Sequence, residues 1–149
     1  MIYLLSKLIK NLKFKIKSRK IIKNFRNNIE NGLYNETDSW NSFIYTITTK
    51  ELDSLNEIQR KAVLCFLYDA EVNSGGHNSF FENYTDFDSN ELYNALKEVS
   101  SEEIANNYKN ALKNKNDGEK EDYIFYKFNP SLTDYLQKYV EENKDKIFN

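Results

Sequence analysis

The sequence predicts an all-α domain, and three observations lead to this prediction. Four glycines and one proline in 149 residues supply too few tight turns for a β-sandwich or barrel. Apolar residues recur at spacings of three and four along much of the chain, as they do on one face of an α-helix. Residues that favour helix N-termini precede several of these apolar runs. We therefore expect a compact multi-helix domain around a buried central helix.

The charge distribution divides the chain into two parts. Residues 1–29 hold nine Lys and Arg residues and no acid, whereas residues 30–149 hold 12 basic and 23 acidic residues. The net charge of −2 therefore combines +9 with −11. We assign residues 1–35 to a basic helical extension and residues 36–149 to a single all-α domain.

The basic extension begins with an amphipathic pattern over residues 2–17. Lysines occupy one side of this predicted helix, and a break near Ser18 separates it from a second helix over about 19–30. Helical packing on the domain is the favoured interpretation of the extension. The apolar side chains that share one face are Ile2, Leu5, Leu8, Ile9, Leu12 and Ile16.

The next elements lead to the central helix. Gly32 is typical of a helix C-terminus, and a short helix around Trp40 follows. The central helix is predicted over about 55–73, because apolar residues occupy all its sides between Ala62 and Ala70. Capping boxes at Ser54–Glu57, Asp88–Glu91 and Ser100–Glu103 are predicted to begin the central helix and two later ones.

The Gly75-Gly76 pair is predicted to end the central helix, and a short helix anchored by Phe80 follows. The residues 123–128, YIFYKF, are the best strand candidate in the chain. Asn129-Pro130 is typical of a helix start and predicts the last helix.

Several function classes are excluded by counting. The single cysteine, Cys65, cannot form an intramolecular disulfide, and with one histidine, His77, it cannot build a zinc site of the usual type. No EF-hand, Walker motif or membrane-spanning apolar run occurs. We expect a cytoplasmic protein with no metal and no cofactor, and a core position for the Cys65 thiol.

One motif resembles a known family. Glu71-Val72-Asn73-Ser74-Gly75-Gly76-His77, followed by Phe80, Phe81 and Asn83, is similar to the E-V-N-x-G-G-[FH]-x-x-[YF]-F-x-N signature of the DNA-mimic protein family. The resemblance covers roughly residues 40–112. It implies an all-α fold, a structural role for the motif residues, and a bacterial regulatory protein that forms a dimer. It further implies a non-catalytic interaction in which carboxylates imitate DNA phosphates toward a helix-turn-helix regulator.

The candidate partner-binding acids are those after the motif. The main set is Glu82, Asp86, Asp88, Glu98 and Glu102, and further acids of the region are Glu91, Glu103, Asp117, Glu119, Glu121 and Asp122. For Glu91, Glu103 and Asp88, helix capping is the competing interpretation.

Two other hypotheses stay open. Residues 2–17 could contact a membrane surface, or nucleic acid, through a basic amphipathic helix, although this is not the favoured interpretation. An enzyme centred on Glu71 and His77 is less favoured, because no nucleophile is fixed by spacing. The structural interpretation is that Glu71 and Asn73 bind backbone amides freed at the turn while His77 packs under the aromatic pair.

Overall fold

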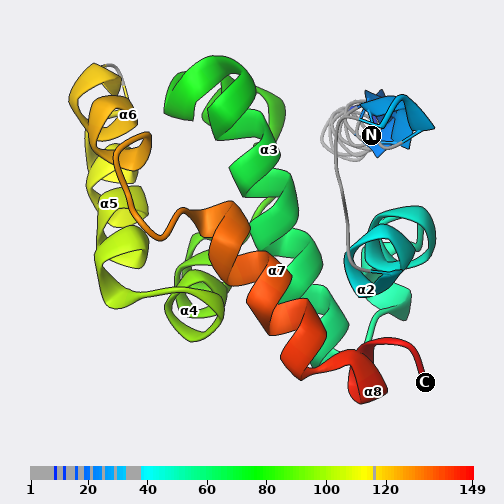
Figure 1. Cartoon of the computed structure of the whole chain (residues 1–149). Helices are drawn as coiled ribbons and strands as arrows, with labels where there is room; N and C mark the ends of the chain where they lie inside the picture. Colours follow the sequence, from blue (N-terminus) through cyan, green and yellow to red (C-terminus); the bar gives the residue numbers. More distant parts are fainter. Residues whose placement is uncertain are drawn as a thin grey trace.

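The computed structural model confirms the all-α prediction (Figure 1). Every regular element among the residues that it describes is a helix. These residues are 38–115 and 117–149, together with 9, 12, 16, 19–20, 22–24, 26–28 and 30–32 of the basic extension.

Short helices lead into one long central helix. Helix α2 (Asp38–Ser42) continues into the π-helix η1 (Phe43–Ile47), and a 3-10 turn, η2 (Leu52–Ser54), follows. Helix α3 spans Glu57–Asn83 and is interrupted at Gly76, whose φ of 76° and ψ of 179° are not helical. The central helix is thus two helical pieces, and the predicted end near residue 73 falls close to the interruption.

Five further helices complete the domain. They are α4 (Ser89–Val99), α5 (Glu102–Lys113), α6 (Glu119–Phe125), α7 (Leu132–Glu142) and α8 (Lys144–Ile147).

Helix α3 lies in the middle of the domain. It packs against α4, α6, α7 and α8, with α4, α5 and α6 on one side and α2 on the other (Figure 1). Every residue from Ala62 to Val72 is buried. A helix that is covered on all sides needs apolar side chains all around it, which explains the continuous apolar run in the sequence.

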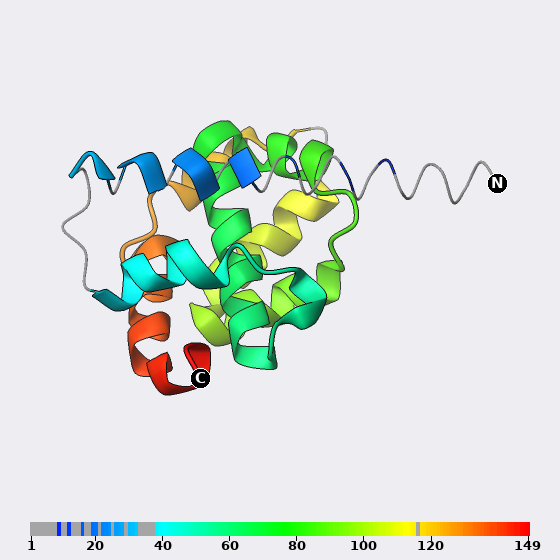
Figure 2. The ribbon, with the colours of Figure 1, turned by 90° about the vertical axis from the view of Figure 1, so that its right-hand side faces the viewer.

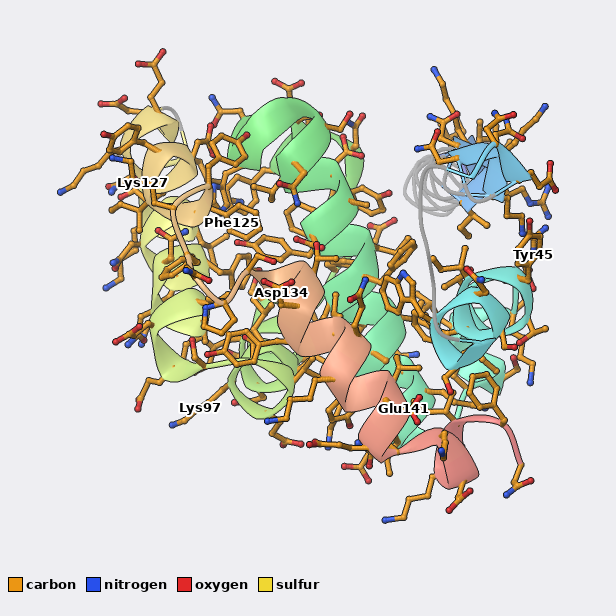
Figure 3. All side chains as sticks on the ribbon, viewed as in Figure 1. Tyr45, Lys97, Phe125, Lys127, Asp134 and Glu141 are labelled. Atoms are coloured by element: carbon orange, nitrogen blue, oxygen red, sulfur yellow. The ribbon has the colours of Figure 1, made fainter. Side chains whose placement is uncertain are left out.

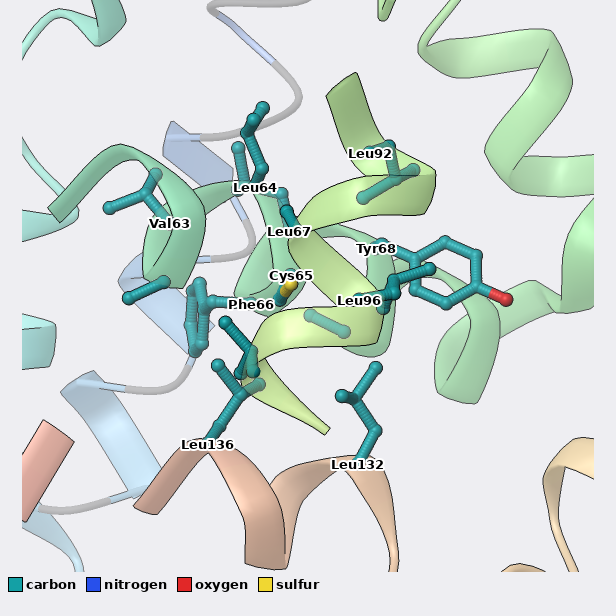
Figure 4. Packing of buried hydrophobic residues seen from close by; sticks show 14 of the residues in the cluster. Val63, Leu64, Cys65, Phe66, Leu67, Tyr68, Leu92, Leu96, Leu132 and Leu136 are labelled. Atoms are coloured by element: carbon teal, nitrogen blue, oxygen red, sulfur yellow. The ribbon is translucent and has the colours of Figure 1, made fainter. Parts of the chain in front are cut away.

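The core continues from α3 into α4 and α7. Leu132 and Leu136 project from α7 toward α3 and α4, where Leu96 lies (Figure 4). On the other side of α3, the Trp40 and Phe43 rings pack edge-on against Phe66 with centroids 6.2 and 5.9 Å away. The helix order therefore depends on apolar contacts between segments that are far apart in the chain.

The start of α3 differs in detail from the prediction. The capping box is formed by Asn56 and Gln59 and not by Ser54 and Glu57: the Asn56 side chain accepts from the Gln59 amide at 2.9 Å, and the Gln59 side chain accepts from the Asn56 amide at 3.0 Å. Ser54 instead belongs to the 3-10 turn, where its hydroxyl donates to a carbonyl of the same turn.

The caps of α4 and α5 also differ from the predicted boxes. Asp88 caps α4 as predicted, but the Glu91 side chain accepts from Arg60 of α3 instead of returning to the cap. Helix α5 is capped by Ser101 and not by Ser100, whose hydroxyl donates to a carbonyl of α4. Adjacent polar residues compete for a cap, and tertiary contacts decide between them.

The strand prediction for residues 123–128 is wrong. This stretch contains the end of α6 and a turn, because an isolated strand would have had no partner. Phe125 points from α6 toward α3 (Figure 3). The last long helix, α7, is capped by Ser131 in a box with Asp134, and not by Asn129.

The described part of the basic extension is helical and has two different environments. Ile22 is buried in the core cluster, and the Arg26 side chain donates to the Tyr45 carbonyl oxygen of η1. Leu12 and Ile16 are each 59% exposed. Figure 2 shows the later part of the extension, the described residues between 19 and 32, running above α2. The predicted break at Ser18 lies outside the described residues.

We predict that Leu96→Ala destabilises the domain by about 3 kcal/mol, because Leu96 is 0% exposed and its truncation leaves a cavity beside α3. Urea unfolding followed by circular dichroism measures this loss. The exposed neighbour Asn94 provides the control, and Asn94→Ala should change the free energy of unfolding by less than about 0.5 kcal/mol. Equal effects of the two substitutions would contradict the assigned core.

Candidate functional site

The motif residues surround the interruption of α3 at Gly76. A β-carbon added at Gly76 would run into the Asp122 carboxylate of α6, and its positive φ further disfavours any other residue. The break frees backbone amides that the helix no longer pairs. The His77 amide donates to Asp122 Oδ1 at 2.8 Å, so a carboxylate from a different helix satisfies the turn.

His77 occupies the centre of this turn. Its Nδ1 lies 2.6 Å from Asp122 Oδ1, and its Nε2 lies 2.7 Å from the Tyr68 hydroxyl. The ring is fully buried. The enzyme hypothesis grouped His77 with Glu71, but the carboxylate partner of His77 is Asp122, 45 residues away in the chain.

These contacts assign the protonation of His77. Burial lowers the pKa of His77, and this effect outweighs the hydrogen bond and charge of Asp122, which raise the pKa. A neutral ring has one N–H, and the carboxylate can only accept, so Nδ1 donates to Asp122 and Nε2 accepts from Tyr68. Burial also raises the pKa of Tyr68 well above its usual value, which keeps its hydroxyl protonated as a donor.

Glu71 joins the two pieces of α3. Its carboxylate Oε1 accepts from the Ser79 hydroxyl at 2.5 Å and from the Asn83 side-chain amide at 2.9 Å, and Glu71 is 1% exposed. The prediction that Glu71 and Asn73 bind backbone amides freed at the turn is therefore wrong about their partners. Asn73 donates to the carbonyl and carboxylate oxygens of Asp69 at 2.8 and 2.9 Å.

Asp69 is a second buried carboxylate of this region. Besides Asn73, it accepts a hydrogen bond from the Thr133 hydroxyl of α7 at 2.5 Å. Burial raises the pKa of Asp69 to about 6, although both hydrogen bonds act in the opposite direction. A cavity of about 470 Å³ lies beside Asp69, and Asn24 and Asn28 of the basic extension contribute to its wall.

Aromatic side chains enclose the polar turn. Phe80 is 1% exposed and stacks on Tyr84 with a centroid distance of 5.2 Å. Phe81 lies 6.3 Å from the His77 ring, and Phe125 approaches that ring edge-on at 5.8 Å. This low-polarity environment strengthens the internal hydrogen bonds and excludes water from them.

The predicted partner-binding acids lie outside this buried region. All five members of the main set are exposed. Three of them precede or begin α4, and two flank the connection between α4 and α5. Lys61 Nζ contacts Glu98 at 2.6 Å, and Lys97 Nζ contacts Glu102 at 3.4 Å. Among the described residues, no ion pair involves the other three, which are Glu82, Asp86 and Asp88.

The later acids divide between surface and interior. Asp117, Glu119 and Glu103 are exposed, whereas Glu121 is 4% exposed and accepts a hydrogen bond from Asn114. With Asp122 bound to His77, two of these candidate partner-binding acids have internal hydrogen-bond partners. The sequence placed both among the surface acids, because a run of charges gives no sign of which side chain turns inward.

The chemistry available at the motif is limited by burial. Both ring nitrogens of His77 are engaged in hydrogen bonds, and the Cys65 thiol is fully buried with a pKa raised well above its usual value by burial. The described residues contain no group of three or more His, Cys, Asp or Glu side chains able to hold a metal ion. Nor does any helix that can be described combine the length and apolar character needed to cross a bilayer.

The fold and this site place the chain in a class of helical proteins whose motif is buried and whose surrounding helices expose many acidic side chains. The family of DMP19-like proteins matches residues 53–148, which is more than half of the chain, and the chain belongs to this family. It is a DNA mimic family. No curated protein and no solved structure matches the chain.

We predict that Gly76→Ala destabilises the fold by about 3 kcal/mol or more, because strain at positive φ adds to displacement of the Asp122 carboxylate. Gly32 is a matched control, since it also has positive φ (70°) but nothing lies within 4 Å of an added β-carbon. Gly32→Ala should cost about 1 kcal/mol. Denaturant unfolding measures both, and equal losses would argue against the Asp122 contact.

The Asp69 pKa leads to a prediction about pH. The folded chain binds a proton at Asp69 more tightly than the unfolded chain, whose pKa is near 3.8. Its protonation thus stabilises the fold by about 3 kcal/mol below about pH 4, and this contribution is lost as the pH rises through 6. Asp69→Asn removes this contribution, so the difference in unfolding free energy between wild type and variant should decrease by most of that amount from pH 4 to pH 7.

Titrated urea unfolding provides this measurement. His77 contributes in the opposite direction, because its lowered pKa makes the fold less stable as the pH falls below 6.5, but it is present in both proteins and cancels in the difference. The exposed Asp117 is the control, and Asp117→Asn should leave the pH dependence unchanged. If the unfolding free energies of wild type and Asp69→Asn changed in parallel with pH, the raised pKa of Asp69 would be refuted.

Proposed function

We propose that the chain is a non-catalytic, cytoplasmic interaction protein whose acidic helical surface binds a basic DNA-binding protein, of the helix-turn-helix class, in place of DNA. Membership of a DNA mimic family supports the general interpretation. The observation that carries the specific proposal is the charge of the matched segment: residues 53–148 hold 19 acidic and 11 basic residues, a net charge of −8.

The placement of the exposed acids supports the same proposal. Asp88 begins α4 and Glu98 lies in its last turn, so this 11-residue helix separates them by about 15 Å along its axis. Helices hold carboxylates at fixed spacings, and duplex DNA presents about one charge per 1.7 Å of its axis. A basic DNA-binding surface that approaches these helices would therefore meet negative charges held at fixed positions.

The ion pairs indicate which of these exposed acids keep more of their negative charge for a partner. Lys61 and Lys97 partly neutralise Glu98 and Glu102 at the end of α4. Glu82 and Asp86, before α4, are exposed and have no such partner among the described residues. We therefore propose the connection between α3 and α4 as the main contact for a cationic partner.

The absence of catalysis is part of the proposal. The burial of His77 and the internal hydrogen bonds of Glu71 support it, because a general base has to reach a substrate proton.

The test is affinity capture of partners from the native cytoplasm with the full chain, at low and high salt. We expect a DNA-binding regulator that is released by high salt and displaced by its own duplex operator, because DNA and the chain would compete for one surface. A captured protein that binds the chain and its DNA at the same time would overturn the mimicry.

We predict that Glu82→Gln with Asp86→Asn weakens this binding about fivefold, since each exposed ion pair contributes on the order of 0.5 kcal/mol. The control pair Glu142→Gln with Asp145→Asn removes the same charge from α7 and α8 and should retain the affinity. Titration calorimetry with the captured regulator measures both. Equal weakening would mean that net charge, and not the α3–α4 connection, determines binding.

A further inference from the structure

The basic extension displays an apolar face that the domain does not cover. Ile9, Leu12 and Ile16 are helical and are 48%, 59% and 59% exposed. Their spacings of three and four residues place them on one side of a helix. Three large aliphatic side chains exposed together on one face are more than the isolated apolar residues of an ordinary protein surface.

The same extension is held to the domain farther along the chain. Ile22 follows Ile16 by six residues, and it is 6% exposed and belongs to the core cluster. The Arg26 side chain donates to the Tyr45 carbonyl oxygen. The extension therefore has one anchored segment, at Ile22 and Arg26, and one segment with exposed aliphatic side chains that is available to a partner.

Cationic side chains accompany the available face. Lys20 and Lys23 follow Ile16 by four and seven residues along the chain, and both are exposed, as is Arg19. Residues 1–29 contain nine basic residues and no acid. Long basic side chains can lay their methylene stems along an apolar surface and keep the charge at its polar boundary.

We propose that the basic extension binds the surface of an anionic lipid bilayer, with Ile9, Leu12 and Ile16 inserted at the boundary of the acyl chains and the basic residues among the headgroups. An anionic membrane complements both properties of this face at once. Nucleic acid complements the charge but offers no apolar surface for the aliphatic side chains. The polar acidic surface of a second copy of the chain has the same shortcoming.

The acidic domain stays away from the membrane in this arrangement. Residues 53–148 carry −8 and would be repelled by anionic headgroups. Only the extension therefore docks, and the domain with its exposed acids remains in the aqueous phase. The proposal concerns a surface that is distinct from the one assigned to a DNA-binding partner.

The experiment is cosedimentation of the full chain with two kinds of vesicle, phosphatidylcholine alone and an equimolar mixture with phosphatidylglycerol. We expect binding to the mixed vesicles that weakens with salt, and little binding to the neutral ones. Leu12→Glu with Ile16→Glu should reduce the partition coefficient by about tenfold or more, because two inserted side chains are replaced by anions. Lys20→Gln with Lys23→Gln should weaken binding to the mixed vesicles only.

The control adds the same negative charge elsewhere. Asn94→Glu with Gln137→Glu changes two exposed positions on α4 and α7 and should leave vesicle binding unchanged within about twofold. All replaced residues are exposed, and circular dichroism with thermal unfolding verifies that each variant folds.

Three outcomes would overturn the proposal. One is no binding of the wild type to mixed vesicles at low salt, whether or not the chain then binds duplex DNA. Another is vesicle binding that survives Leu12→Glu with Ile16→Glu, which would assign the binding to charge alone. The third is a wild-type oligomer that ignores vesicles and becomes a monomer in that variant, which would identify a second copy as the occupant of the face.

Discussion

The contact between the Asp122 carboxylate and the turn at Gly76-His77 is the interaction on which the rest of the motif depends. One carboxylate oxygen accepts from both the His77 amide and the His77 ring, and the ring in turn accepts from Tyr68. This series of hydrogen bonds connects α6 with both pieces of α3. Hydrogen bonds to a charged group contribute about 1.5–3 kcal/mol each, and a lost carboxylate would leave buried donors unpaired. Gly76 is required because any β-carbon would occupy the space of that carboxylate.

The acidic residues of this protein serve two different purposes, according to whether they are buried or exposed. Asp69, Glu71, Glu121 and Asp122 have internal hydrogen-bond partners, so they maintain the fold and are poor candidates for binding a partner. Without them, the segment 53–148 still holds 15 acidic residues against 11 basic ones. An acidic composition by itself therefore overstates the charge that a partner would meet. In the proposed contact, the acids before α4 would matter more than the total charge, because Lys61 and Lys97 neutralise part of the charge at the other end of α4.

The sequence predicted the helices well because residues close together in the chain determine them. It missed contacts between residues that are far apart in the chain. The apolar periodicity of α4, the cap at Asp88 and the break at Gly76 follow from residues near one another. The pairing of His77 with Asp122 spans 45 residues, and nothing in a run of charges marks the member that turns inward. The stretch 123–128 has the aromatic composition of a strand, yet it forms the end of α6 and a turn, in which Phe125 packs against Tyr68 and His77. For Glu98 and Glu102, the sequence predicted exposure but not their partial neutralisation by Lys61 of α3 and Lys97 of α4.

The opposite charges of the extension and the domain raise the question of whether they cancel each other. The described part of the extension lies on the side of α3 where α2 is found, whereas α4 and α5 lie on the other side (Figure 1). A helix with its side chains is about 10 Å across, and charges farther apart than about 8 Å are largely screened at physiological salt. Arg19, Lys20 and Lys23 therefore leave the acids of α4 and α5 available. Because α3 separates the two surfaces, the two proposed interactions, with a positively charged partner on one side and an anionic surface on the other, would not compete directly.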